Sequence, residues 1–231
     1  MTEDHLPALT PFAPASMIES VDRLGWGLRV VFYRDRDRHA HIVAAVQHSN
    51  TPQESVMPLL RSVEGPADST WPPSPPLQSM SIEIRPTGSV ALMVGMAGRS
   101  HWSMSVEAAS GRAHVAFGQP QLAFDVACRA DGSQGFLGST YRAVAATNRW
   151  LQGDGPSQCT MVTPLGPLHL EATRVILGEA TDRTVVLGPA SDLSRPSSSI
   201  RWTYDLQLIP DHESYEGSAA ESGRPPPHNV H

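Results

Sequence analysis

The sequence predicts an all-β domain of mainly antiparallel strands, built as a barrel or as a two-sheet sandwich. About ten short segments either alternate between apolar and polar residues or are rich in β-branched and aromatic residues. Turn residues separate these segments at short spacing, and strands and helices do not alternate regularly as they do in parallel sheets. We therefore expect at most one or two short helices.

The length of 231 residues suits one domain with two weakly patterned ends. Residues 1–16 contain three prolines and are expected to be loosely ordered. Residues 17–209 are expected to form the single β domain. Residues 210–231 are rich in proline, serine, glycine and glutamate and carry no apolar pattern, so a disordered tail is predicted there.

The first part of the domain predicts a hairpin. Residues 16–23 are compatible with one or two turns of helix. Residues 26–33 and 41–46 are rich in strand-forming side chains and predict two paired strands. The alternating arginines and aspartates at 34–38 are interpreted as a solvated turn between them. Residues 51–64 stay ambiguous, because a proline interrupts an apolar pattern that would suit a helix.

The middle of the chain carries the clearest patterns. Residues 65–76 are expected to be a loop whose stiff, proline-rich end holds Trp71 against the domain. Residues 77–85 predict a strand. Residues 90–96 are apolar on both faces and predict a central strand that is covered on each side.

A second hairpin is predicted next. Residues 101–107 alternate strictly, and a turn at residues 110–111 leads to a strand at 113–117. With a two-residue turn, Glu107 lies opposite His114, and the apolar residues of both strands share one face. The pattern does not decide whether the polar face of this hairpin points inward.

The remaining segments repeat the strand pattern. Asp131 and Gly132 supply a turn, and residues 145–158 are interpreted as a connection. Further strands are predicted at residues 121–129, 136–144, 168–177, 184–187 and 200–208, the third and fourth of them forming a hairpin.

Composition excludes several classes of activity. All 17 basic residues are arginines, which excludes Schiff-base, pyridoxal-phosphate and P-loop chemistry through a lysine of this chain. The net charge of −6 argues against nucleic-acid binding. The strand–helix nucleophile motif of serine hydrolases is missing. No metal site is predicted, because there is no C-x-x-C pair and no third ligand for His39 and His41, interpreted as surface histidines.

Cysteine usage and the N-terminus bear on location. Cys128 lies on the apolar face of a predicted strand and is interpreted as a buried, inert thiol. A bridge between Cys128 and Cys159 stays open at this point. The N-terminus lacks a secretory pattern, and no apolar run is long enough to span a membrane, so a cytoplasmic location without membrane contact is expected.

One feature invites comparison with small calycin-type barrels. Gly25 and Trp26 lie near the first predicted strand, where those barrels carry a tryptophan. The lipocalin pattern has one residue between the glycine and the tryptophan, whereas here the two are adjacent. The sequence is therefore not assigned to that family, and no cofactor follows from it.

Three hypotheses for function follow from the sequence. The favoured one is a non-catalytic barrel-like domain that binds a small ligand. The second is a hydrolase-type enzyme with a histidine–carboxylate site. The third is a protein–protein interaction module that uses an edge strand at 26–33 and the proline-rich loop. The candidate site residues are Arg99, His101, Glu107, His114 and Tyr141.

Overall fold

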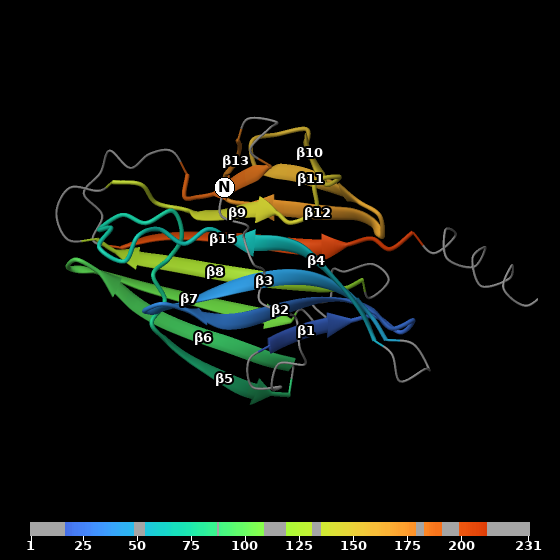
Figure 1. Cartoon of the computed structure of the whole chain (residues 1–231), viewed down its shortest axis with the longest axis horizontal. Coiled ribbons are helices and arrows are strands. Elements are labelled where there is room, and N and C mark those ends of the chain that lie inside the picture. Colours follow the sequence, from blue (N-terminus) through green and yellow to red (C-terminus); the bar gives the residue numbers. More distant parts are fainter. Residues whose placement is uncertain are drawn as a thin grey trace, which may run out of the picture.

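A computed structural model describes residues 17–48, 54–86, 88–108, 119–130, 135–178, 183–190 and 199–211. These residues form two antiparallel sheets that pack as a sandwich (Figure 1). The predicted all-β class is confirmed, and of the two predicted architectures the structure has the sandwich. The described residues form 15 strands, more than the ten or so predicted, and none of them belongs to a helix that could cross a lipid bilayer.

The first sheet has seven strands in the order β1-β2-β3-β4-β9-β14-β13. Every neighbouring pair in it is antiparallel. The strands are β1 (Met17–Val21), β2 (Trp26–Asp35), β3 (Arg38–Gln47), β4 (Ser55–Ser62), β9 (Ser139–Ala143), β14 (Thr184–Leu187) and β13 (Val175–Leu177).

The second sheet has eight strands in the order β10-β11-β12-β15-β8-β7-β6-β5. Its pairs are also antiparallel. The strands are β10 (Arg149–Gln152), β11 (Gln158–Thr163), β12 (Gly166–Ala172), β15 (Ile200–Leu208), β8 (Gln121–Arg129), β7 (Ser100–Ala108), β6 (Gly88–Ala97) and β5 (Ser79–Arg85).

The core lies between the two sheets, where alternate residues of each strand meet. On β7 the inward residues are Trp102, Met104 and Val106, all buried. Trp102 packs edge to face against Trp202 of β15, with ring centroids 6.2 Å apart. Side chains therefore fill the space between the sheets, and the polar face of β7 points outward.

The first hairpin is confirmed, but the segments beside it differ from the prediction. Strands β2 and β3 pair from end to end, and Arg36 in the turn adopts a positive φ of 55°. The residues predicted as a helical turn form β1, which covers one edge of β2, so β2 is not an edge strand. Most of the ambiguous segment 51–64 forms β4. This strand pairs with β3, and a bulge between Val43 and Ala44 shifts the register.

The predicted pairing of Glu107 with His114 is wrong. One edge of β7 is taken by β6, with Glu107 opposite Val90. The other edge is taken by β8, with Glu107 opposite Ala123. Because a strand has only two hydrogen-bonding edges, no further strand can pair with β7. Alternation fixes which face of a strand is apolar, but it does not identify the neighbour.

Two other predicted strands are corrected. Strand β6 was expected to be covered on both faces, yet Val94 and Met96 are 54% and 44% exposed on its outer face. The segment predicted as one strand at 168–177 divides at residues 173–174 into β12 and β13, which belong to different sheets. Only β13 forms the predicted hairpin with β14.

The proline-rich loop packs as predicted. Trp71 is half-buried and meets Trp102 of the core edge to face, with ring centroids 6.4 Å apart. The carbonyl of Pro73 accepts hydrogen bonds from the backbone N–H and the hydroxyl of Thr140 on β9. The loop is therefore fastened to both sheets.

Some predictions lie outside the described residues. These are the loose segment 1–16, the strand at 113–117 with its turn at 110–111, the turn at 131–132, and the tail beyond residue 211. The domain boundaries at residues 17 and 209 stay predictions.

Candidate functional site: an arginine-lined cleft

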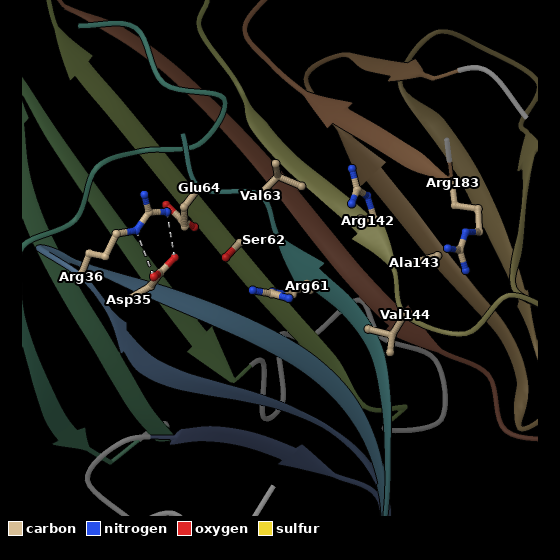
Figure 2. Close-up of a pocket in the computed structure, with 10 residues that line it drawn as sticks. All are labelled: Asp35, Arg36, Arg61, Ser62, Val63, Glu64, Arg142, Ala143, Val144 and Arg183. Atoms are coloured by element: carbon tan, nitrogen blue, oxygen red, sulfur yellow. Dashed lines mark hydrogen bonds and ion pairs between the residues drawn. The ribbon is translucent and has the colours of Figure 1, made fainter. Parts of the chain in front are cut away.

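A cleft of about 380 Å³ opens along the seam between β4 and β9. Its size lies in the range of small-molecule sites. We call it the arginine cleft because four of the residues around it are arginines (Figure 2). The lining residues are Asp35, Arg36, Arg61, Ser62, Val63, Glu64, Arg142, Ala143, Val144 and Arg183.

Strand pairing brings three of the arginines together. Arg61 of β4 and Arg142 of β9 are direct cross-strand partners. Thr184 of β14 is the partner of Arg142 on its other side, so Arg183 stands at the adjoining end of β14. Arg142 is exposed and alternates with the buried Tyr141 and Ala143, which places its guanidinium on the outer face of the sheet.

Like charges placed directly opposite each other destabilise a sheet by some tenths of a kcal/mol up to about 1 kcal/mol. Neither Arg142 nor Arg183 has an acidic partner among the described residues. Arg61 is held by Tyr33, whose hydroxyl oxygen accepts a hydrogen bond from Nε at 3.2 Å. Arg142 and Arg183 therefore place positive charge without a described acidic partner at one site, on a chain whose net charge is −6.

Two carboxyl groups stand at the other end of the cleft. Asp35 pairs with Arg36, with 3.3 Å between Oδ1 and Nε. Burial raises the pKa of Glu64 to about 7, against the opposing effects of a hydrogen bond from Ser62 and the charge of Arg38. The Oε2 atom of Glu64 is buried and has no hydrogen-bond partner within the described ranges.

A buried polar network lies beneath the cleft. The hydroxyl of Ser62 accepts the backbone N–H of His41 at 2.9 Å. The Nε2 atom of His41 shares a hydrogen bond of 2.6 Å with the hydroxyl of Tyr141. That hydroxyl is in turn 2.7 Å from the hydroxyl of Tyr204 on β15. The network thus runs from the cleft wall through the first sheet to the second.

Burial shifts the pKa values of the histidine and the two tyrosines in this network. It lowers the pKa of His41 to about 4, so the imidazole is neutral near pH 7 and can accept a hydrogen bond. Burial also raises the pKa values of Tyr141 and Tyr204, so both remain protonated. Because His41 is 4% exposed and bonded to Tyr141, it serves the core and does not reach a ligand. The prediction of a surface histidine is wrong for His41.

The structure does not bring the sequence-predicted site residues together. His101 and Glu107 lie on the outer face of β7, six residues apart, which is roughly 20 Å along a strand. Glu107 approaches Arg85 of β5 at 3.7 Å. Arg99 is exposed in the turn before β7. Tyr141 is buried in the other sheet, within the network above.

The remaining predicted site residue, His114, lies outside the described residues. The residues that line the arginine cleft were missed by the sequence reasoning. Arg61, Arg142 and Arg183 are each a single charge in an apolar or mixed segment. Only the pairing of β4 with β9, far apart in the sequence, brings them together. The one available signal was the exclusive use of arginine, which suits bidentate anion binding.

A second polar cluster occurs on the first sheet. Glu19, His48 and Glu54 are the one group in the described part of the chain whose potential metal-ligand atoms lie within 4.8 Å of one another. However, the guanidinium of Arg29 forms ion pairs with both glutamates. A metal cation would lie against this guanidinium, so the cluster is best explained as an ion-pair network that joins β1, β2 and the start of β4.

Both cysteines are free thiols, so the bridge left open by the sequence is not formed. Cys128 is fully buried, as predicted, and Cys159 is 2% exposed. Burial raises their pKa values to about 11 and about 12, respectively. Neither thiol lines the arginine cleft.

Comparison with known proteins gives no assignment. The chain matches no protein-family model. No curated protein and no solved structure matches it either. The fold and the arginine cleft are therefore interpreted from their own geometry.

Proposed function

We propose that the protein is a non-catalytic binding domain whose arginine cleft holds a small anion. The observation that carries this proposal is that Arg61, Arg142 and Arg183 line one cleft, with Arg61 and Arg142 as cross-strand partners. Guanidinium groups bind carboxylates and phosphates through paired N–H donors. A bound anion would also relieve the repulsion between the cross-strand pair Arg61 and Arg142.

The charge balance of the cleft supports an anionic ligand. Four arginines and the carboxylate of Asp35 line it, together with Glu64. The formal charge of the lining is therefore +3 when Glu64 is protonated and +2 when it is ionised. A cleft of this size takes a small molecule, and the charge suits a ligand with one or two anionic groups.

The chemistry of the lining favours binding over catalysis. The described lining contains no histidine and no cysteine. Its hydroxyl, Ser62, already accepts the N–H of His41 and bonds to Glu64, so it is not oriented by a free base. For the location of this binding we propose the cytoplasm, since two free thiols suit a reducing compartment.

The test is isothermal titration of the full chain with succinate and with inorganic phosphate. We expect wild-type protein to bind at least one of them, and the Arg142→Ala variant to lose about tenfold in affinity, as expected for removal of one charge-assisted hydrogen bond. Arg149→Ala is the matched control, because Arg149 is an exposed arginine on β10 outside the cleft. Equal affinities in the two variants, or no binding of either anion by wild type, would overturn the proposal.

A further inference from the structure

Arg183 combines a strained backbone with a place in the wall of the arginine cleft. Its φ is 52°, in the left-handed region that side chains other than glycine disfavour. Within the described ranges, the other non-glycine residue with a positive φ is Arg36, which also lines the cleft. The two-residue turn between β2 and β3 accounts for Arg36, because such turns require a left-handed residue. Arg183 instead directly precedes the extended strand β14.

The left-handed backbone decides where the side chain of Arg183 points. On β14, Val185 and Leu187 are buried in the core, and Thr184 and Val186 alternate with them on the outer side. Continued alternation would direct residue 183 inward, where a guanidinium would meet the apolar core. The positive φ interrupts the alternation, and Arg183 lines the cleft instead.

Two hydrogen bonds hold the backbone of Arg183 in this conformation. Its carbonyl oxygen accepts the backbone N–H of Ala143 at 2.9 Å and the indole N–H of Trp150 at 3.2 Å. Neither bond uses the Arg183 side chain, and a glycine would adopt the same φ without strain. The backbone therefore does not explain why an arginine occupies this position. Strain of this kind is typical of binding sites, where it positions a functional side chain.

Arg183 lies at the same end of the arginine cleft as Arg142 (Figure 2). Arg142 pairs with Thr184, the residue after Arg183, so the two arginines stand on adjacent strands with Cα atoms roughly 6 Å apart. Neither guanidinium has an acidic partner in the part of the chain that the structure describes. The acidic lining residues, Asp35 and Glu64, stand at the opposite end.

We propose that Arg142 and Arg183 form a clamp for a single, doubly charged oxyanion group, the phosphate of a phosphate monoester. This inference rests on the proposed function above. Two guanidinium forks supply paired N–H donors and two positive charges. A monoester phosphate matches them with three terminal oxygens and about two negative charges above pH 7. A carboxylate has two oxygens and one charge, so it would leave one fork without a partner.

Two anions of equal total charge test the choice of ligand. At pH 8, methyl phosphate carries about two negative charges on one group, whereas succinate carries one on each of two groups. Isothermal titration of the full chain measures both affinities. We expect methyl phosphate to bind at least about tenfold more tightly than succinate.

Variants of Arg183 test the role of the strained residue. Arg183→Gly should lose about tenfold in affinity for methyl phosphate, because one fork is removed. Its urea midpoint should be no lower than that of wild type, because glycine adopts a positive φ freely. Arg183→Lys keeps the charge without the fork and should retain part of the affinity. Arg149→Gly, at an exposed arginine of β10 outside the cleft, should leave the affinity unchanged.

The double variant tests whether both arginines hold the same group. Two independent contacts, each supplying about tenfold, would together supply about a hundredfold. We expect Arg142→Ala combined with Arg183→Gly to lose clearly less than this, because each fork depends on the other to hold the phosphate. A full hundredfold loss would overturn the shared clamp.

The remaining outcomes separate the two proposals. The inference is overturned if succinate binds as tightly as methyl phosphate, or if Arg183→Gly keeps wild-type affinity while Arg142→Ala loses it. The proposed function stands in both cases. A lower urea midpoint for Arg183→Gly also overturns the inference, because the arginine would then be explained by the fold. If wild type binds none of methyl phosphate, inorganic phosphate and succinate, the proposed function fails as well.

Discussion

Two residues near the cleft couple protonation to folding in opposite directions. Burial raises the pKa of Glu64 to about 7 from an ordinary value of 4.5. Burial lowers the pKa of His41 to about 4 from 6.5. As the pH rises, Glu64 loses its proton at a higher pH in the folded state than in the unfolded state. For His41 the unfolded state takes up the proton first as the pH falls.

The sign of each effect follows from linkage. The stability that protonated Glu64 provides is fully present below pH 4.5 and is lost as the pH rises through 7. The stability that neutral His41 provides is present above pH 6.5 and is lost as the pH falls through 4. Between pH 4.5 and 6.5 the two effects oppose each other, which flattens the pH dependence of the free energy of unfolding.

The Glu64→Gln variant should separate the two effects. The amide that this substitution introduces does not titrate, so the variant should gain stability relative to wild type between pH 4.5 and pH 8, by on the order of 3 kcal/mol. Urea unfolding at several pH values, followed by tryptophan fluorescence, measures this difference. Glu171→Gln serves as the exposed control. A difference between wild type and Glu64→Gln that does not change with pH would contradict the raised pKa.

At the scale of single elements, strand β6 depends on a close contact with the proline-rich loop. A Cβ atom added at Gly95 would lie 1.8 Å from the carbonyl oxygen of Pro76. Neither partner is the end of a flexible side chain, so one segment of backbone has to move. The side chain of Gln78 reinforces the junction by bonding to both the N–H and the carbonyl of Met96.

The Gly95→Ala variant should therefore lose about 2 to 4 kcal/mol of stability, as expected for overpacking against backbone. Gly155→Ala is the matched control, because no atom lies within 4 Å of its added Cβ. We expect that control to stay within about 0.5 kcal/mol of wild type. Chemical unfolding of wild type and both variants measures these differences. Equal free energies of unfolding would show that the proline-rich loop can move away from β6 at little cost.

The elements that the sequence predicted best are those whose signal is local. The β2–β3 hairpin combines strand-forming residues with a short charged turn, and it was found. Strands β4, β10 and β11 were not predicted. Pro58 in β4, and Gly153 and Gly155 between β10 and β11, are residues typical of turns and loops. Their strand conformation comes from pairing with neighbours, which outweighs weak local propensity.

At the scale of the whole molecule, one hydrogen-bonded group joins the two sheets. Tyr141 of β9 bonds to His41 in its own sheet and to Tyr204 in the opposite sheet. The ring of Tyr204 also stacks on Phe124, with centroids 4.5 Å apart. Tyr141 therefore joins the two sheets, while the hydroxyl of Tyr204 also bonds to Ser139 and lies 4.0 Å from Sδ of Met104.

Truncation of the two hydroxyls should reveal the hydrogen bond that they share. Tyr141→Phe leaves both His41 and Tyr204 without their shared partner and should cost about 2 to 3 kcal/mol. Tyr204→Phe leaves the bond between Tyr141 and His41 intact but also removes the bond with Ser139, and it should cost about 1 to 2 kcal/mol. The double variant should be more stable than the sum of the two losses predicts, which urea unfolding can measure. Strictly additive losses would contradict a shared bond.

The candidate site could not be predicted from the sequence, because it depends on which strands are neighbours in the sheet. Arg61 and Arg142 meet only because β9 pairs with β4, a contact between segments that lie far apart in the sequence. The residues proposed from sequence, such as His101 and Glu107, were chosen because they share one face of one strand. A shared face follows from alternation, whereas a shared cleft depends on the order of strands in a sheet, which no single segment encodes.

Labelling of the two buried thiols can report which part of the sandwich opens first. A thiol reagent attacks the thiolate, and both Cys128 and Cys159 are covered and have pKa values far above neutrality. Modification therefore requires the second sheet to open first. Cys159 lies on β11, next to the four-residue edge strand β10, whereas Cys128 lies on β8 in the interior of the sheet. The order in which the two are labelled thus distinguishes fraying at the edge from unfolding of the whole sandwich.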